Sequence, residues 1–367
     1  MRTEAVNNQP LGHHSSFHII INVSLGCARW PNADVPDTSD RNWMTVPLLC
    51  LSEWGSKVWG DGQQPEASSV SWVKWARKQQ IFLCPTPFEP LTMGSSDIPP
   101  PHVSSHVVPV CNALLQLGGG LWTICYILLT RESIKSQSYG MPMFALAFNF
   151  AWELVYALTV AEATLEKICF GIWMAIDCGL VYGLLKYGHN EWNHAPAVKN
   201  HLGSIFIVLL GGCLVGHWAF AKWWLDNSLG ARQGKFYAGK DMGPDTTELG
   251  FWSAATAQLI LSAASLSQLL IRGHTGGVSW SVWASRLLGT IVGLDMNYLW
   301  AWYFWREAHT YVMSPFAIFL WGTGLACDLA YPFVYLQVQK TTKVLDGGRK
   351  IRFETEHVSA TRREKNL

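Results

Sequence analysis

Charge is scarce in this sequence. Lys, Arg, Asp and Glu make up 14% of its 367 residues, whereas an ordinary soluble domain carries about 25%. The few charges also cancel, because there are 27 basic and 26 acidic side chains. A chain without a basic excess has little electrostatic attraction for nucleic acid, so we expect no nucleic-acid partner. The shortage of charge itself favours a protein that lies in a membrane.

The common catalytic and metal-binding motifs are absent as well. The sequence contains no Walker loop, no GxSxG, no HExxH, and neither DDxxD nor DxDD. We therefore do not expect it to ionise a prenyl diphosphate held by Mg²⁺. Its nine cysteines form no CxxC pair. His189, Glu191 and His194 lie close together in one short polar loop, but such side chains are usually just solvated. We expect no metal and no cofactor.

What the sequence does contain is long apolar segments. From residue 107 onward there are seven stretches of about 20 residues, each long enough to cross a bilayer as a helix. Backbone polar groups must be satisfied internally in lipid, so this pattern predicts an all-α fold, an integral membrane bundle of seven transmembrane helices. The expected spans are 107–129, 141–161, 168–186, 202–225, 249–271, 280–304 and 312–338.

The chain divides into three parts. Residues 1–106 are interrupted by Pro, Ser and Gly, and their longest apolar run, 17–25, is too short to cross a membrane. We predict an N-terminal extramembrane extension with little order there, a membrane domain at 107–339, and a basic tail at 340–367. Lys and Arg concentrate at the span ends on the side of that tail, so the positive-inside tendency places the tail in the cytoplasm and 1–106 in the lumen.

Four acidic residues lie inside the predicted spans, namely Glu153, Asp177, Asp295 and Asp328. A charged side chain at the centre of a bilayer costs on the order of 3 kcal/mol even on the lenient insertion scale. A carboxyl group that is removed from water favours its neutral form, and a neutral carboxyl group can act as a general acid. Each of these residues is therefore a candidate for chemistry.

Glu153 has the more informative surroundings. In MPMFALAFNFAWELVYAL, helical spacing places Asn149 and Tyr156 on the same face as Glu153. We expect both side chains to lie within reach of its carboxyl group. Two neutral hydrogen-bonding neighbours would orient this carboxyl group and keep it protonated.

Asp328 lies in GLACDLAYPFVY, where Tyr331 follows it by nearly one turn and Pro332 interrupts the helical hydrogen bonds. The competing interpretation of any such acid is a polar contact between helices. We favour that interpretation for Asp177 and Asp295, and for Asp295 we expect a partner in Arg286 of the same helix or in Asn297.

At MPMFALAFNFAWELVYAL and again at GLACDLAYPFVY, the chain resembles the fungal membrane-bound meroterpenoid cyclases of the pyripyropene and paspaline type. The resemblance covers residues 107–340. It implies a terpene cyclase that protonates the terminal epoxide of a prenylated aromatic or indole substrate and so starts a carbocation cascade. In that family a Glu of the second span and an Asp of the last span are the suspected acid pair, and they match Glu153 and Asp328 here.

The resemblance also implies how such a reaction is supported. The substrate would be lipophilic and reach the site from the membrane lipid, and a prenyltransferase and an epoxidase would act before it in the pathway. We expect a multi-pass protein of the endoplasmic reticulum. Asn149, Tyr156, Trp152 and Tyr331 are the predicted substrate-binding residues. Aromatic faces can stabilise a moving positive charge, and the tryptophans placed for this are Trp152, Trp173, Trp218, Trp300 and Trp321.

Two other classes remain open at this point. A seven-span receptor or transporter would use the intramembrane acids to bind a ligand or to carry protons. A structural subunit would use them only for hydrogen bonds between helices. Formation of a product distinguishes the enzyme from the first class, and the loss of activity in Glu153→Gln distinguishes it from the second.

Overall fold

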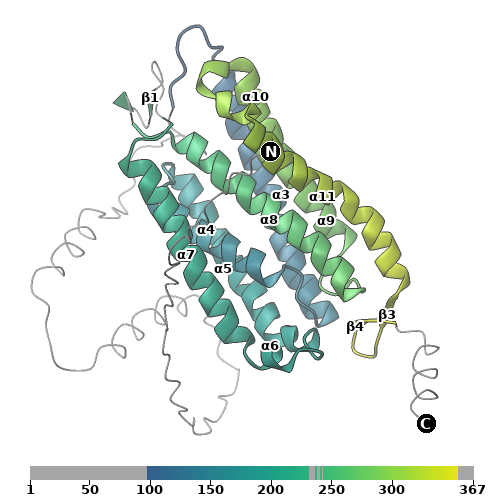
Figure 1. Cartoon of the computed structure of the whole chain (residues 1–367). Coiled ribbons are helices and arrows are strands. Elements are labelled where there is room, and N and C mark those ends of the chain that lie inside the picture. The colour runs from purple at the N-terminus through teal and green to yellow at the C-terminus, as the bar shows by residue number, and fades with distance from the viewer. Residues whose placement is uncertain (1–96, 231–235, 238–239, 242, 354–367) are drawn as a thin grey trace, which may run out of the picture. The chain divides into compact units, whose positions relative to one another are not determined.

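The computed structural model describes residues 97–230, 236–237, 240–241 and 243–353 (Figure 1). All of them belong to a compact unit that spans Pro85–Leu367. Most of the predicted extension and the end of the basic tail lie outside the described residues. Residues 97–106 are described and precede the first described helix, where Val103 packs against Trp305 and Ala308.

The described part is a bundle of helices. They are α3 (Val107–Ser136), α4 (Met143–Thr159), α5 (Thr164–Tyr187), α6 (Pro196–Asn200), α7 (Leu202–Asp226), α8 (Thr246–Arg272), α9 (Trp280–Thr290), α10 (Asn297–Phe304) and α11 (Pro315–Lys340). Short 3-10 turns lie at Gly188–Asn190, Arg306–Ala308 and Thr310–Met313. Two antiparallel strand pairs complete it, β1 (Phe236–Tyr237) with β2 (Lys240–Asp241) and β3 (Thr342–Val344) with β4 (Lys350–Arg352).

All seven predicted apolar stretches are helical, but they are not equivalent. Five of the described helices are long and apolar enough to cross a membrane: α3, α5, α7, α8 and α11. Helix α4 has 17 residues and is shorter than such a span. The stretch at 280–304 consists of α9 and α10 joined by a π-helical segment, Ile291–Met296. The structure thus supports a helical membrane protein, while the count of seven spans stays a prediction.

Local sequence explains where several helices begin. The side chain of Asp245 accepts a hydrogen bond from the backbone N–H of Glu248 at 2.9 Å, so α8 starts three residues before the predicted span. Helix α11 starts at Pro315, and the hydroxyl of Ser314 caps it by accepting from the N–H of Ala317. Helix α3 continues to Ser136, beyond the predicted end at 129, because charged residues of its last two turns extend past the apolar part.

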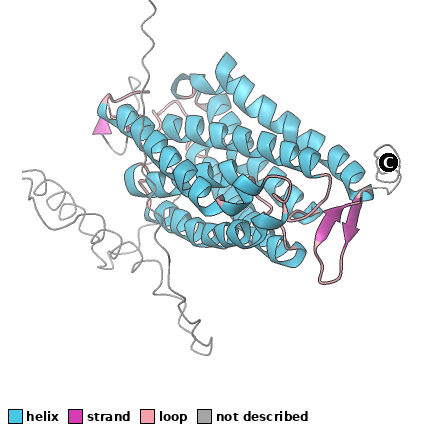
Figure 2. Cartoon of the chain, turned by 60° about the horizontal axis from the view of Figure 1, so that its bottom comes forward, coloured by secondary structure: helices cyan, strands magenta, loops and turns pink. Residues whose placement is uncertain are grey.

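The helices pack as neighbouring pairs, chiefly α8 with α11, α4 with α7, and α3 with α9. The backbones of α3 and of the π-helical segment come especially close. A Cβ atom on Gly118 would lie 2.3 Å from the Cα of Gly293, so only glycine allows this crossing. In both Figures 1 and 2 the hairpin of β3 and β4 lies at one end of the bundle, which we call the hairpin end.

Candidate active site

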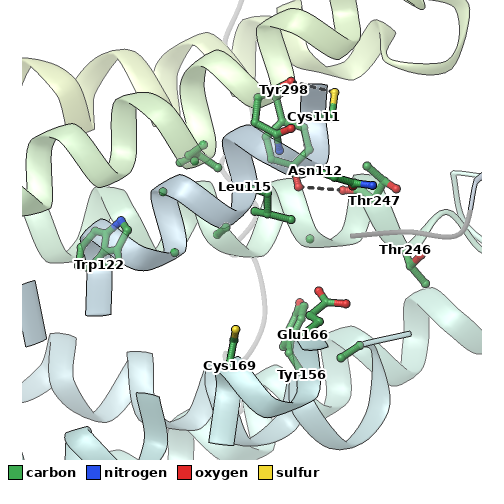
Figure 3. A pocket seen from close by; sticks show the side chains of 18 of the residues that line it. Cys111, Asn112, Leu115, Trp122, Tyr156, Glu166, Cys169, Thr246, Thr247 and Tyr298 are labelled. Atoms are coloured by element: carbon green, nitrogen blue, oxygen red, sulfur yellow. Dashed lines mark hydrogen bonds between the residues drawn. The ribbon is translucent and has the colours of Figure 1, made fainter. Parts of the chain in front are cut away.

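A cavity of about 240 Å³ lies inside the bundle, between α3, α4, α5, α8 and the segment from α9 to α10 (Figure 3). Its wall is mostly apolar and aromatic. The ring residues that line it are Trp122, Trp152, Tyr156, Phe170, Trp173, Tyr298 and Trp305. A cavity of this composition suits a lipophilic molecule.

Three of these rings are held in fixed orientations. Trp152 and Trp173 both pack edge-on against Phe170, with centroid distances of 5.2 and 5.7 Å. The indole N–H of Trp152 donates to Ser253 at 3.0 Å, and that of Trp173 donates to Thr123 at 2.8 Å. Since the polar edges are bonded to hydroxyl groups, these rings hold their positions in the wall.

Glu153 belongs to a fully buried polar cluster contributed by three helices. The side-chain nitrogen of Asn149 donates to the Oε1 atom of Glu153 at 2.9 Å, to the hydroxyl of Tyr126 at 2.8 Å and to the Oδ2 atom of Asp177 at 3.2 Å. One amide nitrogen carries two hydrogens, so three acceptors compete for them. Glu153 and Asp177 have no exposed surface, and no cation pairs with either one among the described residues.

Asp328 has the opposite surroundings. Its Oδ1 atom accepts from the guanidinium of Arg286 at 2.6 Å, and its Oδ2 atom accepts from Ser262 at 2.8 Å and from Gln258 at 3.1 Å. The indole of Trp283 donates to the backbone oxygen of Asp328 at 2.9 Å. Asp328 is 1% exposed and Arg286 is 5% exposed, so this ion pair is buried.

Both clusters adjoin the cavity through an amide. Asn149 and Gln258 line the cavity, whereas the carboxyl groups of Glu153 and Asp328 lie one hydrogen bond behind them. No hydrogen bond joins the two acids within the described structure, so they occupy separate positions on the wall. Of the predicted substrate-binding residues, Asn149, Trp152 and Tyr156 line the cavity. Tyr331 does not, and its ring lies beside Arg286.

No hydrogen bond joins Tyr156 to Glu153 in the described structure. The ring of Tyr156 packs against Trp152 at 5.5 Å and His217 at 6.1 Å instead. The tyrosine of the Glu153 cluster is Tyr126 of α3. Helical periodicity identifies neighbours on one helix only, so it could not point to a residue on another one.

The expected pair of Asp295 and Arg286 is also absent. Nine residues of helix separate their positions by about 13 Å along the axis, which is too far for an ion pair within one helix. Arg286 reaches across to α11 and pairs with Asp328. Of the five tryptophans singled out above, Trp152 and Trp173 line the cavity, while Trp218 is exposed on the outside of α7.

The other end of the cavity is polar and was not predicted. Glu162 and Glu166 line it beside Thr246 and Thr247 of α8, and Figure 3 shows Glu166 and both threonines around the opening. Thr246 donates to Glu162 at 2.6 Å, and Thr247 donates to Asp97 at 2.9 Å. These acids lie outside the expected spans, where carboxylates are ordinary surface residues, so the sequence carried no signal for them.

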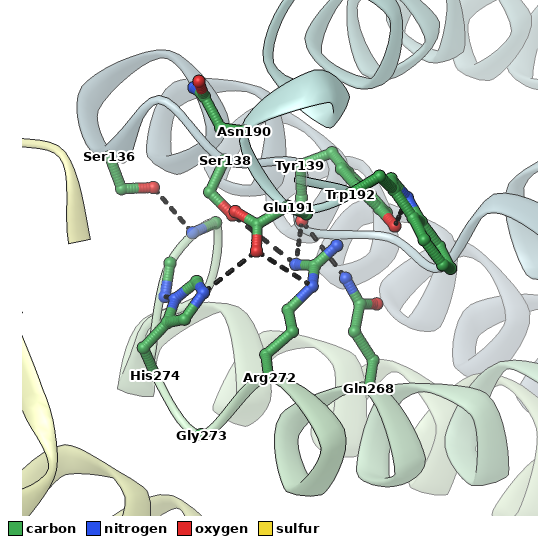
Figure 4. A network of polar contacts seen from close by, with 12 residues as sticks. Ser136, Ser138, Tyr139, Asn190, Glu191, Trp192, Gln268, Arg272, Gly273 and His274 are labelled. Carbon is green, nitrogen blue, oxygen red and sulfur yellow. Dashed lines mark hydrogen bonds and ion pairs between the residues drawn. The ribbon is translucent and has the colours of Figure 1, made fainter. Parts of the chain in front are cut away.

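A second buried polar network closes the hairpin end (Figure 4). Glu191 binds the ring of His274 at 2.9 Å and lies 3.6 Å from Arg272, whose guanidinium donates to the backbone oxygen of Tyr139 at 2.7 Å. Burial favours the neutral form of Glu191, but the hydrogen bond from His274 and the charges of Arg272 and His274 lower its pKa below the usual 4.5. The network joins loops, and no cluster of metal ligands occurs among the described residues.

Comparison with known proteins adds independent evidence on the family of this chain. Residues 95–341 match the sequence model of the Pyr4-like transmembrane terpene cyclases. The terpene cyclase ascF of Acremonium egyptiacum is 46% identical over 259 residues, which cover 70% of this chain and 92% of the relative. The Pyr4-family terpene cyclase mfmH of Annulohypoxylon moriforme is 33% identical over 65% of this chain and 90% of its own length. The terpene cyclase ptmB of Penicillium ochrochloron is 34% identical over 67% and 92%. No solved structure matches the chain.

Proposed function

This chain belongs to the Pyr4-like transmembrane terpene cyclases, and from that premise we propose that it protonates the terminal epoxide of a prenylated aromatic or indole substrate and cyclises the resulting carbocation. The membership confirms the resemblance seen in the sequence. It does not favour a receptor or a transporter, because the named relatives are terpene cyclases.

The observation that carries the proposal is the position of Glu153. Its carboxyl group is fully buried, has no cationic partner among the described residues, and lies one hydrogen bond behind the wall of an apolar cavity. Two carboxyl groups that share one amide donor without a cation repel each other when ionised. Burial without a cation also disfavours the charge of each group, so both Glu153 and Asp177 hold protons. A neutral carboxyl group is the donor that epoxide opening requires.

The reaction is balanced without a co-reactant. The proton of Glu153 moves to the epoxide oxygen, the C–O bond at the more substituted carbon breaks, and its electron pair stays on oxygen. Alkenes of the prenyl chain then attack the cation in turn, and a final carbocation loses one proton. The product is an isomer of the substrate, so the activity needs neither a diphosphate leaving group nor a cofactor.

The cavity wall suits the cationic intermediates. Trp152 and Trp173 line the cavity and keep their N–H groups bonded elsewhere, so they offer no nucleophile that would trap the cation. Each aromatic face stabilises a nearby cation by about 0.5–2 kcal/mol. Exclusion of water protects the intermediates from hydration.

The remaining parts of the proposal concern the setting. We place the protein in the endoplasmic reticulum membrane with seven spans and the C-terminal tail in the cytoplasm. The substrate enters from the bilayer, after a prenyltransferase and an epoxidase have made it. The polar end of the cavity, near Glu166 and Thr246, accepts the aromatic head group while the prenyl chain lies among the rings.

The test is product formation in membranes that contain the full chain. Two synthetic probes serve as substrates, a phenol and an indole that each carry a prenyl chain with a terminal epoxide. We expect a cyclised product of unchanged mass from at least one probe. Specific binding or transport of both probes without any isomerisation contradicts the proposal.

A further inference from the structure

The two acids of the cavity wall differ in the kind of hydrogen bond that they receive. Among the described residues, Glu153 Oε2 and Asp177 Oδ1 are buried without a partner, and one amide nitrogen serves the remaining oxygens of the pair. Both oxygen atoms of Asp328, in contrast, accept from donors. The first arrangement leaves room for protons on the carboxyl groups, and the second does not.

The donors around Asp328 are complete. The two amide hydrogens of Gln258 are directed at Ser262, at 2.8 Å, and at Asp328, so the hydroxyl hydrogen of Ser262 is left to donate to Asp328. A carboxylate only accepts hydrogen bonds, whereas a carboxylic acid must also donate one. Since every side-chain hydrogen bond of Asp328 in the described structure comes from a donor, its surroundings fit the carboxylate.

Arg286 supplies the matching charge. Its guanidinium is buried, lies 2.6 Å from Asp328, and stacks over Tyr331 with 5.0 Å between the guanidinium carbon and the ring centre. Asp328 is its only ion-pair partner within the described structure. The other titratable groups around the pair are Cys125 of α3, Asp295 of the π-helical segment, and Cys327 beside Asp328. None of these is a second cation.

We propose that Arg286 is a positioning residue of the cyclase, which holds Asp328 as a carboxylate behind Gln258 while the carboxyl group of Glu153 stays neutral. This inference rests on the proposed function. The two acids then have different tasks. Glu153 gives the first proton, and the negative charge of Asp328 stabilises the cation and accepts the last proton through its Oδ2 side. Exchange with solvent afterwards returns one proton to Glu153 and removes one from Asp328, so the proton balance is zero.

The test uses the full chain in membranes and the variants Arg286→Lys, Arg286→Gln, Asp328→Asn and the double variant Arg286→Gln with Asp328→Asn. The double variant removes both charges and replaces them with amides, so it avoids the cost of one unpaired buried charge. Turnover of the two epoxide probes and the amount of inserted protein are measured between pH 6 and about 9.

We expect Arg286→Lys to stay within about tenfold of the parent, because it keeps the charge. Arg286→Gln should lose about 10²-fold in turnover at neutral pH and recover as pH rises, since Asp328 then ionises without its counter-ion. The double variant should insert normally and stay inactive at every pH. A double variant with near-parent turnover, or an Arg286→Gln profile with the parent's shape, overturns the inference and leaves Arg286 as a structural contact.

Infrared difference spectra test the same inference without substrate. The carbonyl band that protonated Glu153 contributes should disappear in Glu153→Gln while the band of protonated Asp177 remains, and both bands should persist in Asp328→Asn. Arg286→Gln should gain a further band of this kind that the double variant lacks. A band lost in Asp328→Asn contradicts the inference. If the parent isomerises neither probe but shows the expected bands, the proposed substrate class fails while the assignment of charges holds.

Discussion

Asn149 lies between the cavity and the acid cluster of Glu153 and Asp177. Its amide lines the wall and donates to Glu153, Asp177 and Tyr126. In the proposed reaction, Glu153 behind this amide gives the first proton and regains one after the cascade.

Glu153→Gln is the decisive substitution at this scale. Gln keeps the shape of Glu and its contact with Asn149, but an amide does not donate a proton to an epoxide at a useful rate. General acid catalysis contributes about 10²–10⁴-fold, so turnover should fall by at least that order. The measurement is isomer formation in membranes with equal amounts of inserted protein.

Asp295→Asn is the matched control, because Asp295 lies in a predicted span but, in the described structure, no hydrogen bond joins it to Asn149 or Gln258, the two amides that line the cavity beside the other acids. It should lose less than about tenfold, and Asp177→Asn should behave in the same way, since Asn mimics a neutral carboxyl group there. Near-parent turnover of Glu153→Gln would remove Glu153 as the proton donor.

Residues on one helix could be predicted, and residues on different helices could not. The contact of Asn149 with Glu153 follows from their spacing of four, and the structure has it at 2.9 Å. Tyr126, Asp177 and Arg286 come from other helices, and no periodicity reports how helices are rotated against each other. The sequence thus pointed to Glu153 and Asp328 as candidate acids, but it did not show which side chains of other helices surround them.

At the scale of the elements, apolar length located every described α-helix except the five-residue α6, because lipid requires long stretches without charge. Length did not reveal interruptions. The π-helical segment Ile291–Met296 lies within the single stretch predicted at 280–304, and the sequence does not show that it packs against Gly118 of α3. This close crossing of two helices depends on Gly118 and Gly293, and the apolar length of a stretch does not report it.

Gly118→Ala should destabilise the protein, because the added Cβ atom would lie 2.3 Å from the Cα of Gly293 and both atoms belong to packed helices. Overpacking of this kind costs about 1–3 kcal/mol. Thermal unfolding of the protein in detergent measures the effect.

Gly212→Ala in α7 is the control. A Cβ atom there has nothing within 4 Å, and Ala favours a helix over Gly by about 1 kcal/mol. The control should be as stable as the parent or slightly more stable. Equal melting temperatures for Gly118→Ala and the parent would show that the two helices can move apart without loss.

At the scale of the whole molecule, the loops at the hairpin end are joined by the ionised Glu191. Its pKa is lower in the folded protein than the usual 4.5. The resulting stability is therefore complete above that value and is lost as pH falls through the lower pKa of the folded state.

Glu191→Gln should reduce stability at pH 7 by about 1.5–3 kcal/mol, the range for a hydrogen bond to a charged group. The difference from the parent should shrink below about pH 4.5, where the parent's carboxylate becomes protonated. Melting curves of the parent and of Glu191→Gln at several pH values measure this difference. A difference that is constant between pH 7 and pH 3.5 would contradict this account.

The membrane domain should work without residues 1–96, because every described residue that lines the cavity is Asp97 or a later one. A chain that begins at residue 97 should insert and keep turnover within about tenfold of the parent. A chain that begins at residue 107 should be weaker, since it loses Val103 and the contact of Asp97 with Thr247. An inactive but well-inserted first truncation would show that the extension takes part in catalysis.

The π-helical segment has a consequence for inheritance. Successive residues of a regular helix are turned by about 100°, and a π-helical turn holds one residue more than an α-helical turn. An in-frame deletion of a single codon within Ile291–Met296 would remove this extra residue and let the segment become regular helix, so the residues beyond it would keep their direction. Asn297, Tyr298 and Ala301 would then still line the cavity, whereas the same deletion in a regular helix would turn all later residues by about 100°. Gene variation in this family should therefore include chains one residue shorter at this segment, while exchanges of Gly293, where a Cβ atom would lie 2.9 Å from the Cα of Gly118, should be rare.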